Sequence, residues 1–201
     1  MKRIELALIF GLLTALLFAD TAAFGKECQQ ISSEVLRLHI PANSDSEADQ
    51  AVKLEIRDAI LARTGELFYA AGTADQAAAI AEKELAEFER IANGILREKG
   101  FSYTARAEVC RMFFATRTYG ELTMPAGQYQ AVRITLGEGA GQNWWCVLFP
   151  PLCLPAATET PEDSFSREEQ EILEREVRYE PRFAVVEWFE QLMDQLAGIF
   201  S

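Results

Sequence analysis

Acidic side chains are plentiful in this chain of 201 residues, but the paired ones lie on predicted helix faces, where runs of charge are usually only solvated. The single histidine, His39, lies in an alternating run that predicts a half-buried strand. One hypothesis is a nucleophile at Cys146 with His39 as its base, because the two could lie on neighbouring strands. Cys146 lies in an apolar run, however, where the pKa of a thiol rises and its nucleophilicity is masked. No third group orients His39 as a catalytic triad requires, so a structural histidine is favoured.

The other motifs offer little catalytic chemistry. One histidine and scattered cysteines do not have the ligand spacing of a zinc site. The glycine-rich stretch 137–141 lacks the Lys-Ser/Thr ending of a phosphate loop. The pair Trp144-Trp145 leaves a small-ligand binding module as an alternative, although adjacent aromatic residues are more often core. We therefore expect a protein that is not an enzyme and that has no cofactor and no metal.

The net charge limits the kinds of partner that this chain could bind, and its first residues indicate the compartment. The formal net charge is -12, which argues against nucleic acid and against an anionic lipid surface. Lys2 and Arg3 precede an apolar run, residues 6–19, and small residues follow it. These are the three parts of a signal peptide, so we expect residues 1–23 to direct export, with an uncleaved anchor as the alternative.

Export would allow the cysteines to pair. Four cysteines permit three pairings, and the sequence alone does not choose among them. Cys146 and Cys153 are seven residues apart with Pro150-Pro151 between them, so a bridge there would close a small loop at the end of a strand. Two buried, unpaired cysteines are the alternative. Cys110 is expected to be buried and unpaired.

The periodicity predicts one α+β domain over residues 34–154. Strands are expected near residues 35–40, 102–112, 128–136 and 144–149. One helix should begin after the turn residues 43–46, and a second should begin near Thr73 and end at Gly100. The element order predicts a largely antiparallel sheet of about four strands, with both helices on one face.

Two further segments follow this domain. Residues 155–181 are rich in Glu and predict an acidic, solvated linker. Residues 182–201 predict an amphipathic helix, which suits a protein groove better than a lipid surface. Its apolar stripe would consist of Val185, Phe189, Leu192, Met193, Leu196 and Phe200. Docking of this helix on its own domain is the alternative.

Five segments have distinctive sequences that core packing alone does not explain. They are LHIPANSDS at residues 38–46, KLEIRD at 53–58, FATRTYG at 114–120, PAGQY at 125–129 and NWWCVLFPPLC at 143–153. In this order they resemble the stage II sporulation protein R family of endospore-forming bacteria. The resemblance runs from about residue 34 to residue 154.

The resemblance implies a secreted signalling protein. Such a protein is made in the forespore and exported into the space between the forespore and mother-cell membranes. There it is needed to activate a membrane-embedded aspartic protease that processes the sigma-E precursor. The family supplies no catalytic residue to transfer.

The surface that meets the protease has to be inferred from the residues. The stretch 114–127 is longer than a hairpin needs and carries Arg117 and Tyr119, residue types that are enriched in binding hot spots. Covering a sheet edge is the alternative role for this stretch. Asn43, Asp45 and Trp144, from the particular segments, are further candidates for partner contact.

Overall fold

The computed structural model describes residues 24–119 and 122–150, together with Gly11, Ala184, residues 186–188 and residues 191–192. The expected export signal apart from Gly11, the acidic linker and Cys153 lie outside the described residues. The chain divides into two compact units. The sheet unit comprises Ser33–Met112 and Gln128–Phe165, and the second unit comprises Met1–Ser32, Phe113–Gly127 and Ser166–Ser201.

Two long helices form where the apolar periodicity predicts them. Helix α2 spans Glu47–Leu67 and is followed by the short 3-10 helix η1, Phe68–Ala70. Helix α3 spans Ala74–Glu98. Both helices begin where predicted, and each start has an N-cap: the Ser46 hydroxyl accepts a hydrogen bond from the Asp49 amide, and the Thr73 hydroxyl accepts one from the Gln76 amide. Each cap satisfies one of the amide groups that the first helical turn leaves without a partner.

Four strands form one mixed sheet. They are β1 (Leu36–Pro41), β2 (Ala105–Phe114), β5 (Gly127–Leu136) and β6 (Asn143–Phe149), in the order β2-β5-β1-β6. The α+β class and the four strands are confirmed. Strand β1 is antiparallel to β6 but parallel to β5, so the sheet is less antiparallel than predicted. A parallel neighbour needs a crossover connection, and α2 and α3 lie within the connection from β1 to β5.

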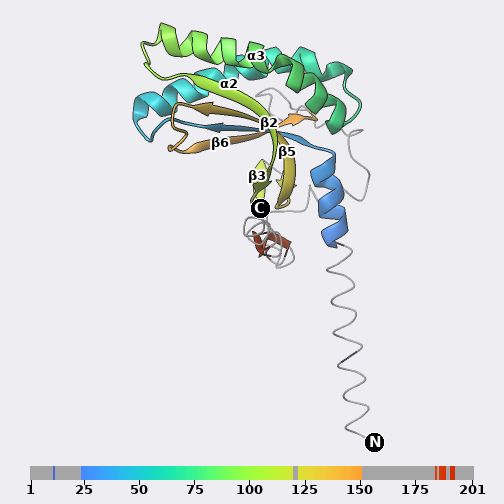
Figure 1. Cartoon of the computed structure of the whole chain (residues 1–201). Helices are drawn as coiled ribbons and strands as arrows, with labels where there is room; N and C mark the ends of the chain where they lie inside the picture. Colours follow the sequence, from blue (N-terminus) through green and yellow to red (C-terminus); the bar gives the residue numbers. More distant parts are fainter. Residues whose placement is uncertain are drawn as a thin grey trace, which may run out of the picture. The chain divides into compact units, whose positions relative to one another are not determined.

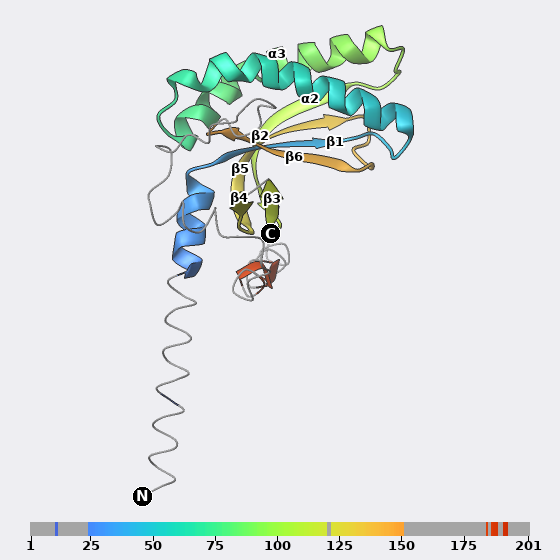
Figure 2. The same ribbon diagram turned by 180° about the vertical axis from the view of Figure 1, so that it is seen from behind.

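Both helices cover the same face of the sheet, as predicted (Figure 1; Figure 2 shows the arrangement from behind). The core lies between these layers and is lined by Leu36, Leu38, Ile40, Val52, Ile56, Ile60, Phe88, Leu96, Val132, Ile134, Leu136, Cys146 and Leu148. Strand β2 begins at Ala105 rather than at residue 102. The preceding aromatic residues, Phe101 and Tyr103, still pack against this core.

The second unit contains structure that the sequence did not predict. Residues 24–32 of this unit are helical, with Phe24, Cys28 and Ile31 buried. Within the stretch 114–127, β3 (Arg117–Tyr119) pairs antiparallel with β4 (Leu122–Met124).

The expected C-terminal helix is described only in part. The described residues between 184 and 192 are helical, with Val186 buried and Leu192 exposed. Most residues of the predicted apolar stripe lie outside the described residues, so the stripe stays a prediction. None of the described helices is long and apolar enough to span a membrane.

Candidate functional site

The turn after β1 is joined to the loop that connects β5 to β6. We call these two segments, residues 42–46 and 137–142, the junction. The Asn43 Oδ1 accepts a hydrogen bond from the Glu138 amide at 3.1 Å, and the Asp45 Oδ1 accepts one from the Gln142 amide at 2.7 Å. The Gly141 amide donates to the Ala42 carbonyl at 2.8 Å. The junction therefore fixes one end of the sheet.

Asp49, in the first turn of α2, links the junction to Tyr103, which precedes β2. Its side chain accepts hydrogen bonds from the Asn43 amide group at 3.0 Å, from the Ser44 hydroxyl at 2.5 Å and from the Tyr103 hydroxyl. Burial tends to raise the pKa of Asp49, but these bonds together hold it below its ordinary value. Burial and the bond to Asp49 raise the pKa of Tyr103. Asp49 is therefore an ionised acceptor that positions three neighbours.

Lys53, one turn further along α2, binds the other side of the junction. Its side chain is 5% exposed, and its ammonium donates to Gln50 Oε1 at 2.5 Å and to the Gln142 carbonyl at 2.9 Å. Burial lowers the pKa of Lys53, and attraction to Asp45 opposes that change. The segment KLEIRD at 53–58 thus contributes to the same structural cluster as the turn at 42–46.

The predicted contact residues Asn43 and Asp45 are brought together in the junction. Both use a side-chain oxygen to hold a backbone amide within their own domain. These hydrogen bonds give Asn43 and Asp45 a structural role. A role of the two residues in partner contact stays a prediction.

The two adjacent tryptophans are separated by the sheet. Trp144 packs against the helix-covered core, and the Arg57 guanidinium carbon lies 4.2 Å from the centre of its ring. Trp145 stacks on His39, with ring centroids 4.0 Å apart and planes inclined by 13°. The side chains of consecutive strand residues point to opposite faces, so the pair does not form one ligand-binding surface.

The contact between Arg57 and Trp144 gives a modest stability prediction. We expect Arg57→Ala to lower the free energy of unfolding by about 1 kcal/mol, because it removes a partly buried cation–π contact. Arg57→Lys should lose less, since an ammonium retains the charge. Urea unfolding of Arg57→Ala, Trp144→Leu and the double variant measures the coupling between the two side chains. Additive losses would contradict a direct interaction.

The hypothesis of a Cys146–His39 pair does not fit the geometry. Leu38 lies opposite Cys146, and both belong to the helix-covered core, whereas His39 lies opposite Trp145 and stacks on it from the other face. The sheet therefore separates the proposed nucleophile from its base. Burial lowers the pKa of His39 to about 4, in part opposed by a hydrogen bond with Asn143. His39 is a neutral packing residue at pH 7.

The structure describes three of the four cysteines. Cys110 is free, as predicted, but half-buried rather than buried, and Cys28 is buried. Cys146 is in the disulfide form. Its expected partner, Cys153, lies outside the described residues, so the pairing of these two stays a prediction.

A pocket of about 740 Å³ opens beside the junction. It is lined by Glu89, Ser102, Tyr103, Thr104, Arg106, Ala107, Glu108, Arg133, Thr135, Gly137 and Glu138. Arg133 and Glu108 face each other at 3.8 Å across β5 and β2. The sequence does not predict this pocket, because only the pairing of β2 with β5 brings its residues together. In the described part of the chain, no group of three or more His, Cys, Asp or Glu side chains could hold a metal.

The other predicted contact residues, Arg117 and Tyr119, lie on β3 opposite Met124 and Leu122. Arg117 is exposed and Tyr119 is half-buried. Arg117 and Tyr119 lie two positions apart on one strand of a short hairpin. Residues 120 and 121 of this hairpin lie outside the described residues. Their role in partner contact stays a prediction.

Comparisons with known proteins agree with the resemblance seen in the sequence. The family model described as stage II sporulation protein R matches residues 32–159. The chain is similar to stage II sporulation protein R of Bacillus subtilis (strain 168), with 39% identity over 123 residues, or 61% of this chain. The aligned part spans about half, 55%, of that relative. No solved structure matches the chain.

Proposed function

The chain belongs to the stage II sporulation protein R family, and from this premise we propose that it is a secreted signalling protein of sporulation. In this proposal it is exported from the forespore into the space between the forespore and mother-cell membranes. There it activates the membrane-embedded aspartic protease that processes the sigma-E precursor. The match of the family model to residues 32–159 is the observation that carries the proposal, because it covers the motifs from which the resemblance was inferred.

The sheet unit also supports a role in binding rather than in catalysis. The separation of Cys146 from His39 removes the one nucleophile–base pair that the sequence suggested. The basic start and apolar run of residues 1–19 support the proposed export. The proposed partner is a protein, in keeping with the acidic net charge of -12.

Deletion of the gene in its spore-forming host tests this function. We expect the sigma-E precursor to remain unprocessed on immunoblots during sporulation, and expression of the intact gene in the forespore to restore processing. His39→Gln should also restore processing, because the proposal gives His39 no catalytic role. Normal processing in the deletion strain would overturn the proposal.

For the contact surface we propose the hairpin formed by β3 and β4. Arg117 and Tyr119 present a cation and an aromatic ring from one strand, and these residue types contribute strongly to protein interfaces. We expect Arg117→Ala combined with Tyr119→Ala to stop sigma-E processing by a protein that is still exported and folded. Arg97→Ala, which removes an exposed arginine of α3, is the matched control and should leave processing unchanged. Processing at the wild-type rate in the double variant would exclude this hairpin.

A further inference from the structure

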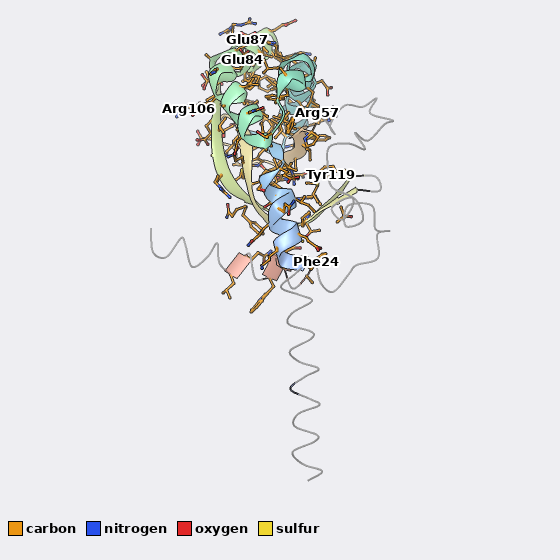
Figure 3. All side chains as sticks on the ribbon, turned by 90° about the vertical axis from the view of Figure 1, so that its right-hand side faces the viewer. Phe24, Arg57, Glu84, Glu87, Arg106 and Tyr119 are labelled. Carbon is orange, nitrogen blue, oxygen red and sulfur yellow. The ribbon has the colours of Figure 1, made fainter. Side chains whose placement is uncertain are left out.

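Strand β2 forms one edge of the sheet, and α3 covers only part of that edge. In the strand order β2 has a single neighbour, β5. The Asn93 side chain binds both backbone groups of Ala105, donating at 3.1 Å and accepting at 2.8 Å. Glu89 Oε1 accepts from the Ala107 amide at 2.9 Å. The view in Figure 3 places Arg106 and Arg57 on opposite sides of the sheet unit, toward its β2 and β6 edges.

The capping by α3 stops after Ala107. Strand backbone groups alternate in direction, so the groups of Val109 and Arg111 point outward like those of Ala105 and Ala107. One helical turn before Glu89, α3 carries Leu85 and Ala86, which have no polar side-chain atom to reach them. Among the described residues, side chains of α3 bind the outward backbone groups of Ala105 and Ala107 but not those of Val109 or Arg111, and β5 is the only strand beside β2 in this sheet. An open edge of this kind is a template for another strand.

We propose that the Val109–Arg111 edge of β2 pairs antiparallel with the same edge of a second copy of this chain. Val109 of each copy then lies opposite Arg111 of the other. Each of these two residue pairs exchanges two backbone hydrogen bonds, so all the outward amide and carbonyl groups of Val109 and Arg111 are satisfied at once. The contact extends the sheet across a twofold axis.

Charge and capping select this register over its neighbours. If the two strands shifted by one pairing step, Val109 would lie opposite Val109 and Ala107 opposite Arg111. The second pair would need the Ala107 amide, which already donates to Glu89. The next shift in that direction places Glu108 opposite Glu108, and the opposite shift places Arg111 opposite Arg111. Like charges directly opposite each other destabilise a sheet. In the proposed register Glu108 lies opposite Met112, so no like charges meet.

The register also places Cys110 opposite Cys110 of the second copy. This is a non-hydrogen-bonded pair, in which Cα atoms are about 4.5 Å apart, and disulfides accept Cα separations of about 4.4–6.8 Å. Cys110 is free. Burial, with a contribution from Glu108, raises the pKa of its thiol, so cross-linking is best measured at alkaline pH. Cys110 thus reports on the register of the dimer.

The test uses the full chain carrying Cys28→Ala, incubated with oxidised glutathione and run on non-reducing gels. Each bridge forms as two thiols lose two protons and two electrons, which reduce one glutathione disulfide to two thiols. We expect a covalent dimer that reductant removes. Adding Val109→Pro should slow its formation about tenfold, because proline removes an outward amide at a position where an edge strand tolerates it. A chain that stays monomeric under these conditions, or that cross-links equally fast with Val109→Pro, overturns the proposal.

A second set of variants tests the register without proline. In a chain that lacks Cys28 and Cys110, Glu108→Cys alone should not cross-link, because it faces Met112 of the second copy. Adding Met112→Cys should restore the covalent dimer. Equal cross-linking by Glu108→Cys alone would indicate random collision and would contradict the register. Circular dichroism and the rate of thiol alkylation confirm that each variant is folded and that its thiol is accessible.

Discussion

Gly141→Ala is expected to lower the free energy of unfolding by about 3 to 4 kcal/mol. A Cβ at this position would lie 2.2 Å from the Ser44 carbonyl oxygen and 2.4 Å from its carbon. These are backbone atoms, so a change of side-chain rotamer does not relieve the overlap. The loop must move away, which breaks the hydrogen bond from the Gly141 amide to Ala42 and weakens the one between Gln142 and Asp45.

Gly94→Ala is the matched control for this substitution. Gly94 lies inside α3, and a Cβ there meets no atom within 4 Å. Alanine in a helix interior is more favourable than glycine, so this variant should gain about 0.5 to 1 kcal/mol. Urea unfolding followed by circular dichroism measures both changes. Equal effects of the two substitutions would show that the junction does not constrain the fold as described.

Local elements of this fold could be predicted because local residues determine them. Ser46 and Thr73 precede apolar helical stripes at the two predicted helix starts, and both act as N-caps. The alternation in β2 and β5 likewise predicted two strands, since one face of each packs on the core. The order of the strands depends on contacts distant in sequence. The parallel pairing of β1 with β5 therefore could not be derived from periodicity.

For the candidate site too, the sequence predicted local features but not the contacts between distant segments. Asn43 and Asp45 were recognised as turn residues, but their bonds join them to residues 95 and 97 positions later. No local pattern indicates those partners. The pocket beside them depends on the alignment of β2 with β5, which places Glu108 near Arg133. The hairpin of β3 and β4 was missed because strands of three residues are too short to show a period.

The acid sensitivity of the fold is expected to depend on His39. Its pKa is about 4 in the folded protein, because burial disfavours the imidazolium and Arg133 repels it, whereas an unfolded chain has a histidine pKa of about 6.5. Between these values the unfolded state binds the proton and the folded state does not, so stability falls as the pH falls. The stabilising contribution is complete above about pH 6.5 and is lost progressively down to about pH 4. We expect a loss of about 2 to 3 kcal/mol across this window.

Two measurements test this prediction. His39 is the only histidine of the chain, so its imidazole signals in a magnetic resonance titration need no assignment. They should give a pKa near 4 in the folded protein. Urea unfolding at a series of pH values should show a steep loss of stability in the wild type, and His39→Gln should remove most of that slope because glutamine does not titrate. The carboxylate of Asp49 does not account for this window, since its pKa is held below the ordinary value and its contribution is lost only at lower pH. A folded-state pKa at or above 6, or equal slopes for both proteins, would mean that His39 is solvated and does not pack against Trp145.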